Sequence, residues 1–234
     1  MTSLKNDVME WLFPERNLCL ICGYGSPSIG EDHLCRECEQ KMKPLRGHVC
    51  NVCSAPISGS VSLCNDCIRT KRWFDKAVAP LLYQGLTRQQ LHAFKYLGKS
   101  YLYKLFGYQM VQLLKNNDMT RFDGIVPVPI HRRREVVRGY NQSKLLAVYI
   151  SFHLGIPMVE LIKRMKHTPP QMEQKGHARK SNVTHAFSMV SQEQSYKSIL
   201  LVDDIYTTGA TLEACARTLK GSGVEQVIGI TVGR

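Results

Sequence analysis

The segment from residue 199 to residue 212, ILLVDDIYTTGATL, constrains the fold of this chain more than any other. It opens with an uninterrupted apolar run, Ile199–Val202, which is typical of a strand buried on both faces of a parallel sheet. Asp203 and Asp204 follow at the end of that strand, where open α/β sheets bind their ligands. A helical pattern, LEACARTLK, begins after a short turn. The segment therefore predicts an α/β domain with a ligand site at the end of this strand.

The turn between the acid pair and the helix has the composition of an anion site. Its residues are Thr207, Thr208, Gly209, Ala210 and Thr211. Backbone N–H groups and hydroxyls gather there at the positive end of a helix, and Gly209 permits a close approach of a phosphate. We expect a phosphomonoester at this turn, beside acids that suit sugar hydroxyls or a hydrated Mg²⁺. The alternative is an ordinary strand–turn–helix unit with solvated aspartates and a threonine cap.

The string VDDIYTTGAT resembles the 5-phosphoribosyl 1-pyrophosphate (PRPP) motif of type I phosphoribosyltransferases. The resemblance implies that Asp203 and Asp204 bind the ribose hydroxyls and that Thr207–Thr211 hold the 5-phosphate, with Mg²⁺ accompanying PRPP. It makes both acids candidate catalytic residues. Enzymes of this class that act on 6-oxopurines carry an acid at the position of Thr207, so the threonine argues against ordinary purine salvage.

Eight of the nine cysteines form four CxxC pairs, separated by twelve, eleven and ten residues. The pairs are Cys19/Cys22, Cys35/Cys38, Cys50/Cys53 and Cys64/Cys67. Two residues between cysteines let both thiolates face one ion, and two such pairs complete a tetrahedral zinc site. The pattern predicts two structural Zn²⁺ ions, with redox use of one pair as the alternative. Pairing in chain order is simplest, and an interleaved arrangement stays open. We expect Cys215 to be a small buried hydrophobe.

The net charge of +12 originates in the middle of the chain. Residues 76–180 carry 18 Lys/Arg and five Asp/Glu, a net charge of +13. Residues 1–75 are neutral overall, and residues 181–234 carry a net charge of −1. Such a basic surface serves either a polyanion such as nucleic acid or a small polyphosphate such as PRPP. Both interpretations remain open.

The segment VPVPIHRRREVVRGYNQ, residues 126–142, combines a strand end with a basic loop. Its arginines Arg132, Arg133, Arg134 and Arg138 are suited to surround a group with several negative charges, and Gly139 permits a tight turn into a helix over 139–154. In type I phosphoribosyltransferases the loop at this position binds the pyrophosphate of PRPP. The resemblance therefore makes Arg132 and Arg138 candidate catalytic residues. Because three consecutive arginines exceed what one pyrophosphate requires, we also expect Arg132–Arg134 to contact DNA.

Residues 163–184 are polar, basic and rich in Pro, Gln and His, which indicates a long loop that can close over a charged substrate. The further candidate DNA contacts in this region are Arg164, Lys175, Arg179 and Lys180. A solvated charge run, or a plain linker, is the alternative for both basic segments. Aromatic residues near the charges, which are candidates for base stacking, are Trp73, Phe74, Tyr96, Tyr101, Tyr103 and Tyr140.

The rest of the chain alternates strand and helix patterns. We expect helices over 86–97 and 102–114, and strands within 77–83, 122–130, 159–162 and 227–232. Because Pro80 lies inside the first of these strands, we expect an edge strand or a lead-in strand there. A short amphipathic helix is expected before Pro14. The predicted architecture is a type I phosphoribosyltransferase-like parallel sheet flanked by helices (76–234), with a small zinc-ribbon-like module in front of it (1–75).

No apolar run approaches the roughly 18 residues of a membrane helix, and the first residues lack the basic and apolar pattern of a secretory signal. We therefore expect no membrane span and a cytoplasmic protein.

Taken along the chain, the four CxxC pairs, VPVPIHRRREVVRGYNQ, RMKHTPPQ and VDDIYTTGAT resemble the ComF family over nearly the whole length. The resemblance implies a zinc-bearing module on a phosphoribosyltransferase-like domain, in bacteria that import single-stranded DNA during natural transformation. It also implies a partner, the helicase-like ATPase of the same uptake system.

Three functions compete at this point. The favoured one is a PRPP-binding protein of DNA uptake with a basic surface for single-stranded DNA. The alternative is an active phosphoribosyltransferase on an unidentified nucleobase or nucleotide-like acceptor, with no link to DNA. A third is an adaptor whose zinc module docks a protein partner. The intact Asp203 and Asp204 favour PRPP, or a related phosphorylated ligand, in the first two.

Overall fold

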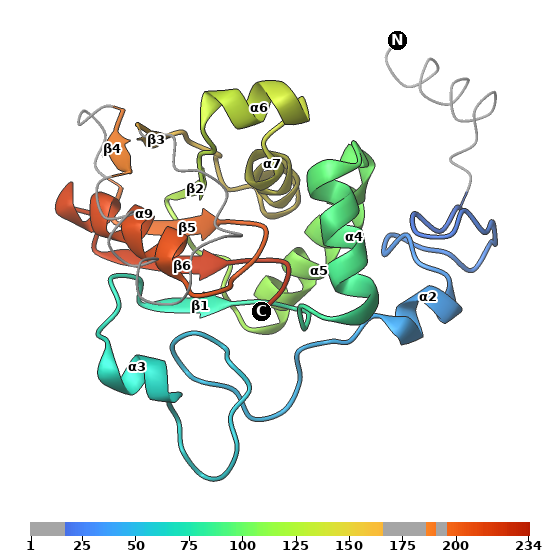
Figure 1. Ribbon diagram of the computed structural model, residues 1–234, viewed down its shortest axis with the longest axis horizontal. Helices are drawn as coiled ribbons and strands as arrows, with labels where there is room; N and C mark the ends of the chain where they lie inside the picture. Colours follow the sequence, from blue (N-terminus) through green and yellow to red (C-terminus); the bar gives the residue numbers. More distant parts are fainter. Residues whose placement is uncertain (1–16, 166–185, 191–195) are drawn as a thin grey trace.

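A computed structural model describes residues 17–165, 186–190 and 196–234 of the chain. Its centre is a four-stranded sheet in the order β1-β6-β5-β2, in which every neighbouring pair is parallel. The strands are β1 (Lys76–Val78), β6 (Gln226–Ile230), β5 (Ser198–Val202) and β2 (Gly124–Pro127). The sheet crosses the middle of Figure 1. The expected parallel α/β architecture is confirmed, and β1 lies at an edge, although it ends at Val78 and does not contain Pro80 as expected.

Alternate residues of each strand supply two separate hydrophobic cores, one on each face of the sheet. In β5, Leu200 and Val202 belong to one core, whereas Ile199 and Leu201 belong to the other. All four side chains are fully buried, which explains why this strand is apolar without interruption.

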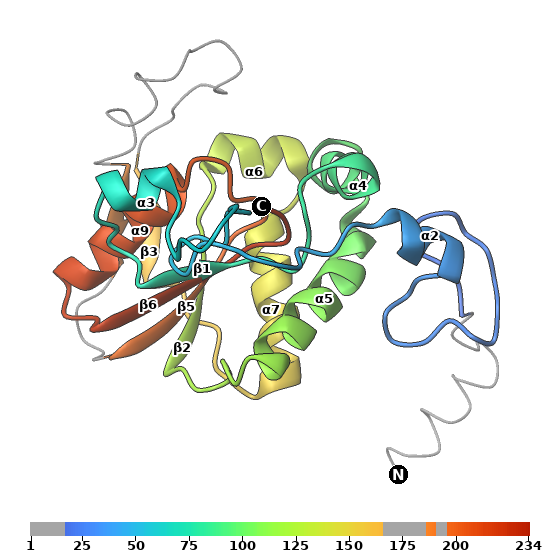
Figure 2. The same ribbon diagram turned by 90° about the horizontal axis from the view of Figure 1, so that it is seen from below.

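Helices cover both faces. The first core is built with α4 (Gly85–Tyr96), η1 (Ser100–Leu102), α5 (Tyr103–Asn116) and α7 (Gln142–Leu154). The second core is built with α9 (Ala210–Gly221). Figure 2 shows α5 and α7 together on one side of the sheet and α9 on the other. The helices predicted over 86–97 and 102–114 are confirmed as α4 and α5.

Two local predictions are wrong. Residues 132–138 form a helix, α6 (Arg132–Arg138), where a basic loop was expected. It forms because the His131 side chain accepts a hydrogen bond from the Arg133 N–H at its start. Gly139, with φ +80°, then ends the helix, so α7 begins three residues later than expected.

The strand expected at 159–162 lies further along, as β3 (Ile162–Arg164). It pairs antiparallel with β4 (Phe187–Met189) in a separate two-stranded sheet beside α9. Arg164 therefore lies in a strand, whereas a loop was expected there. Before it, Met158 makes a single parallel bridge to Ile125 of β2.

The cysteine-bearing part of the chain contributes to both cores. It contains the short helices α2 (Arg36–Lys41) and α3 (Asn65–Arg69). Cys19, Cys35 and Cys38 pack into the first core, and Cys50 and Cys53 pack into the second. Figure 1 accordingly shows α2 beyond α4 and α3 below β1. The helix expected before Pro14 lies outside the described residues. Within the described stretches, no helix is both long enough and apolar enough to cross a bilayer.

Candidate functional site

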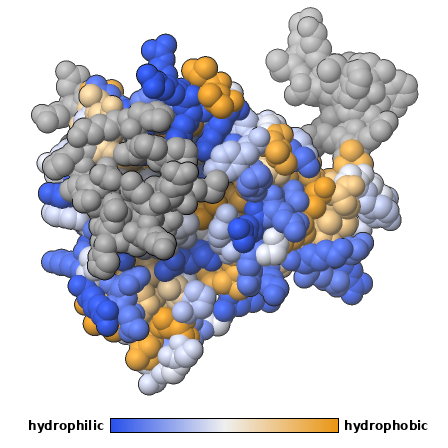
Figure 3. Space-filling view, in the orientation of Figure 1, coloured by the Kyte–Doolittle hydropathy of each residue, from blue (hydrophilic) through white to orange (hydrophobic). Residues whose placement is uncertain are grey.

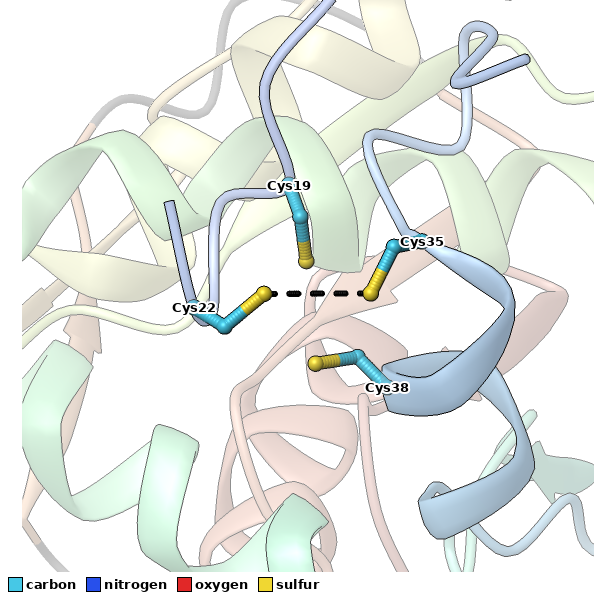
Figure 4. Close-up of side chains that lie close together, drawn as sticks. All are labelled: Cys19, Cys22, Cys35 and Cys38. Atoms are coloured by element: carbon cyan, nitrogen blue, oxygen red, sulfur yellow. Dashed lines mark hydrogen bonds between the residues drawn. The ribbon is translucent and has the colours of Figure 1, made fainter. Parts of the chain in front are cut away.

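The eight paired cysteines form two groups in chain order. The first cysteine cluster is Cys19, Cys22, Cys35 and Cys38, and the second cysteine cluster is Cys50, Cys53, Cys64 and Cys67. Within each cluster all Sγ atoms lie within 4.8 Å of one another. The pairing that the sequence left open is therefore sequential. Figure 4 shows the four thiols of the first cluster, two from a loop and two from the start of α2, turned toward a common centre.

The spacing of the sulfur atoms fits zinc. A tetrahedral site with zinc–sulfur bonds of about 2.3 Å has sulfur–sulfur edges of about 3.8 Å. The Sγ atoms of Cys22 and Cys35 are 3.7 Å apart, and those of Cys53 and Cys64 are 3.6 Å apart. Each cluster thus has the ligand number and the edge length of a closed structural site, which a redox pair does not need.

Backbone N–H groups favour the thiolate at one cysteine of each cluster, whereas burial raises the pKa of the Cys38, Cys53 and Cys67 thiols. Burial opposes ionisation of Cys19, but the N–H groups of Cys22, Cys35 and Ile21 outweigh it and lower the pKa of this thiol to about 7. In the second cluster, burial likewise opposes ionisation of Cys50, and backbone N–H groups lower its pKa to about 6. By contrast, Cys215 is fully buried, and burial raises its pKa, as expected of a small hydrophobe.

The carboxyl ends of the parallel strands collect the residues that the sequence singled out. The acid pair follows β5 and α6 follows β2, while α4 follows β1 and residues 231–234 follow β6. Since all four strands are parallel, these connections meet at one edge of the sheet. That edge is the candidate ligand site.

Both acids of the pair are held by neighbouring elements. Ser143 Oγ, at the start of α7, donates a hydrogen bond to Asp203 Oδ1 at 2.9 Å. Lys95 Nζ of α4 lies 2.9 Å from Asp204 Oδ1, with side-chain exposures of 19% and 11% for the two partners. Burial and the adjacent Asp204 carboxylate raise the pKa of Asp203 to about 7. Burial opposes the charge on Lys95, but the Asp204 carboxylate outweighs it and raises the lysine pKa. Lys95 therefore neutralises part of the negative charge of the acid pair.

The RGYNQ motif, residues 138–142, fastens α4 in place. Tyr140 Oη donates to the carbonyl oxygen of Phe94 at 2.5 Å, and Gln142 Nε2 donates to the same oxygen at 3.5 Å. Arg138 in turn donates to Gln142 Oε1 at 3.2 Å. Because Phe94 immediately precedes Lys95, these bonds position the lysine against the acid pair.

The predicted basic contacts divide into two groups. Arg132 and Arg133 are exposed on α6, whereas Arg134 and Arg138 are half-buried. Burial and the charge of Arg138 lower the pKa of Arg134. Burial and the charge of Arg134 likewise lower the pKa of Arg164, while Asp203 acts in the opposite direction. The charges of Arg138, Arg134 and Arg164 thus act on one another in turn, and that of Arg164 also acts on Asp203; we call these three arginines the chain of charges. Lys175, Arg179 and Lys180 lie outside the described residues.

Of the six aromatic candidates, three are exposed, two are partly buried and one is buried. The Arg138 guanidinium lies 5.0 Å from the centre of the Tyr96 ring, which is 59% exposed. Trp73 is similarly exposed under Arg217. Phe74 is buried, and Tyr103 packs edge-on against Tyr149. Tyr96, Trp73 and the exposed Tyr101 therefore remain available for stacking, whereas the half-buried Tyr140 donates its hydroxyl to the Phe94 carbonyl oxygen.

The expected phosphate turn is open at its tip. Thr207 and Thr208 are exposed, Gly209 is buried with φ +77°, and Thr211 is partly buried in the first turn of α9. The Ala210 N–H lies 3.4 Å from Thr208 Oγ1, and α9 has no side-chain cap at Gly209. The start of this twelve-residue helix thus presents N–H groups and hydroxyls together.

Comparison with known proteins identifies the family. Competence protein F of Haemophilus influenzae is 30% identical over 89% of this chain and 93% of its own length. The chain belongs to the ComF family of competence proteins. Competence protein ComFC of Bacillus subtilis is 27% identical, with 82% of this chain and 80% of the relative aligned. The DNA utilization protein YhgH of Escherichia coli K12 is 26% identical, with 90% and 93% aligned.

The two parts of this ComF-family chain also match separate domain families. Residues 8–68 match the double zinc ribbon domain, and residues 141–233 match the phosphoribosyl transferase domain. The first match includes both cysteine clusters, which are therefore two zinc-binding sites. The second includes Ser143, the acid pair and the turn before α9. The predicted fold class is thereby confirmed.

Sequence reasoning missed three residues of this ComF-family site: Lys95, Ser143 and Arg234, whose guanidinium donates to the carbonyl oxygen of Thr207 in the turn before α9. A signal existed for Lys95, because it continues the buried i, i+4 stripe of α4 from Thr87 and Leu91. A lysine on such a stripe indicates a buried partner. Ser143 and Arg234 carry no comparable pattern, since their roles depend on which elements meet at the sheet edge.

Proposed function

We propose that this protein acts in natural competence, where it handles incoming single-stranded DNA and binds PRPP or a related phosphorylated ribose at the end of β5. The names of the relatives from Haemophilus influenzae, Bacillus subtilis and Escherichia coli support a role in DNA uptake and use. The proposal assigns this work to the cytoplasm, alongside the helicase-like ATPase of the uptake system.

One observation carries the ligand assignment. Asp203 and Asp204 lie at the carboxyl end of a buried parallel strand, held by Ser143 and Lys95, and the open turn of α9 follows directly. Carboxylates there suit ribose hydroxyls, and the N–H groups of the turn suit a phosphate. Mg²⁺ would accompany the pyrophosphate of PRPP, and Arg134 and Arg164 would help to neutralise the negative charge of the pyrophosphate.

Calorimetry of the zinc-loaded protein with PRPP and Mg²⁺ tests this assignment. The double variant Asp203→Asn, Asp204→Asn keeps side-chain volume, and we expect it to abolish measurable binding because neutral amides cannot supply the negative charge and the acceptor oxygens of the acid pair. The matched control is Asp123→Asn, since Asp123 accepts from Lys197 and Ser198 N–H groups at the opposite end of β5. Equal PRPP affinity in the wild type and the double variant would refute the assignment.

Transfer of phosphoribose is the second candidate function, and the chain of charges from Arg138 to Asp203 favours it. In that reaction the acceptor nucleophile forms a bond to C1 of the ribose while pyrophosphate leaves, and positive groups stabilise the departing charge. Pyrophosphate release on addition of nucleobase acceptors to PRPP-loaded protein distinguishes the candidates. Binding without release supports the binding protein, whereas release that depends on Asp203 supports the transferase.

The DNA part of the proposal rests on α6 and the end of α4. Arg132 and Arg133 expose two charges, and the Tyr96 ring offers a stacking face next to Arg138. Figure 3 shows hydrophilic and apolar groups side by side where α6 lies. Such a mixture suits a phosphate backbone and unpaired bases together.

A further inference from the structure

Arg234 connects the second cysteine cluster to the turn before α9. Its Nε donates to the carbonyl oxygen of Cys53 at 2.9 Å, and its Nη2 lies 3.3 Å from Cys53 Sγ. Its Nη1 donates to the carbonyl oxygen of Thr207 at 3.1 Å. A single guanidinium thus contacts a zinc-ligating residue and the residue that begins the open part of the turn.

The backbone holds Arg234 firmly in this position. Its N–H donates to Leu81 O at 3.0 Å, and its carbonyl oxygen accepts from the Tyr83 N–H at 2.9 Å. The adjacent Gly233 carbonyl accepts from the Tyr206 N–H at 2.9 Å, which ties the same segment to the turn. The side chain therefore starts from a fixed point, and its three hydrogen bonds define its direction.

Tyr206 carries the contact onward to Gly209. The Arg234 guanidinium lies 4.2 Å from the centre of the Tyr206 ring, and Phe74 packs edge-on against the same ring at 6.2 Å. The ring lies so close to Gly209 that any side chain there would overlap it. Movement of the guanidinium would thus shift the Tyr206 ring and, through it, Gly209, which immediately precedes α9.

We propose that Arg234 is a positioning residue through which zinc in the second cysteine cluster holds the β5–α9 turn in its ligand-binding form. The inference rests on the proposed phosphate site for its consequence, but the linkage itself is independent of any ligand. A zinc-bound thiolate accepts hydrogen bonds from neighbouring donors, and such contacts orient groups around a metal site. Loss of that metal frees the Cys53 side chain to move and so loosens one end of the bridge.

The first cysteine cluster provides an internal comparison. Its buried members belong to the core on the other face of the sheet, whereas Cys50 and Cys53 share a core with Tyr206 and Leu212. The two zinc sites are therefore expected to stabilise different parts of the molecule. Only the second is expected to act on the turn.

The decisive experiment is hydrogen exchange of the full zinc-loaded chain, read at the amides of residues 207–211. Arg234→Lys keeps the charge, but a single ammonium cannot bond Cys53 and Thr207 in the same fork geometry. We expect about tenfold faster exchange at the turn, equivalent to the loss of one charge-assisted hydrogen bond. The matched control is Arg217→Lys, because Arg217 also lies over an aromatic ring, that of Trp73, but has no hydrogen bond to the cluster or the turn among those described. Arg234→Gln serves as a second variant, and circular dichroism verifies that all variants are folded.

Chelation separates the contribution of the metal. Removal of zinc from the wild type should raise exchange at 207–211, whereas in Arg234→Lys it should add little, because the connection is already broken. In parallel, PRPP affinity should fall about tenfold in Arg234→Lys with zinc content unchanged, again the loss of one charge-assisted bond. The inference is wrong if the turn of Arg234→Lys exchanges at the same rate as in the wild type. It is also wrong if zinc removal leaves the exchange rate of the wild-type turn unchanged. If the wild type binds no PRPP, the proposed function fails while the exchange data still decide the linkage.

Discussion

At the scale of single residues, the main feature is the buried pair of Lys95 and Asp204. A charged group with little access to water is costly unless an opposite charge compensates it. Lys95 thus lowers the net negative charge that the acid pair presents to a ligand. The site consequently differs from a simple pair of solvated aspartates, which was the plain alternative in the sequence.

The first prediction concerns this pair. Lys95→Met should lower the free energy of unfolding by about 3 kcal/mol, because it leaves the Asp204 carboxylate buried and unpaired. Adding Asp204→Asn should recover much of the loss. The control is Lys144→Met. The Lys144 and Glu160 side chains of this pair are 45% and 56% exposed, so the loss of unfolding free energy should be less than about 1 kcal/mol. Urea unfolding measures all three, and similar losses at Lys95 and Lys144 would contradict the buried-pair interpretation.

The second prediction compares two glycines with the same backbone conformation. Gly209 and Gly139 have φ values of +77° and +80°, but only Gly209 has a neighbour, the Tyr206 ring, in the space that a Cβ would fill. Gly139→Ala should cost about 1 kcal/mol of stability from backbone strain alone. Gly209→Ala should cost about 2–4 kcal/mol, since the ring must also move. Thermal unfolding distinguishes the two, and equal costs would show that the ring yields freely.

At the scale of elements, the two cysteine clusters belong to different cores. The short helices α2 and α3 have few residues to bury, so their positions depend on the metal sites and on the face of the sheet that each one joins. The cysteine-bearing segment is therefore attached to the sheet at two places. Each zinc site then stabilises a different part of the molecule.

The third prediction follows from this separation. Elemental analysis of the purified protein should find close to two zinc ions per chain, bound by the eight cysteines of the two clusters. Cys35→Ser should leave one zinc ion and loosen residues 17–42, because a structural zinc site supplies folding energy locally. The sheet should keep its protection from hydrogen exchange. Fewer than one metal per wild-type chain, or disulfides in place of thiols, would rule out two zinc sites.

At the scale of the whole molecule, charge is segregated. Residues 76–180 carry a net charge of +13, and within this segment Arg132, Arg133, Arg134 and Arg138 of α6 follow β2 at the carboxyl edge of the sheet. A strongly basic edge attracts polyanions over distances of about a Debye length, roughly 8 Å in physiological salt. One surface can thus serve both a phosphorylated ligand and a nucleic acid.

The fourth prediction tests that shared surface. Affinity for single-stranded DNA should fall steeply with added salt and depend little on sequence. Arg132→Gln with Arg133→Gln should reduce the slope of log affinity against log salt by about 0.7 for each phosphate that the variant no longer neutralises. PRPP at fixed salt should compete with DNA if the arginines serve both.

The control for the fourth prediction removes the same charge elsewhere. Arg36→Gln with Arg46→Gln changes two exposed arginines of the neutral first segment and should leave the salt slope unchanged. Fluorescence anisotropy with labelled oligonucleotides measures each variant. Equal slopes for both double variants would place the DNA surface away from α6.

Local patterns predicted much of this architecture. The apolar run of β5, the periodic helices α4 and α5, and the spacing of the cysteine pairs each depend on residues close in the chain, where period and geometry are sufficient. The prediction of a loop at α6 was wrong because charge density says little about backbone conformation. The cap at His131 and the stop at Gly139 determine the helix instead.

The sequence by itself determined that the chain carries two zinc sites and an acid pair at a strand end followed by a Thr/Gly turn into a helix, since these are properties of short contiguous segments. Only the tertiary structure decided that Lys95 neutralises Asp204, that the two cysteine clusters join opposite faces of the sheet, and that Arg234 bridges one of them to Thr207. The physical reason is sequence distance. Cys53 and Arg234 are 181 positions apart, and they meet because the segment with the second cysteine cluster packs against one face of the sheet.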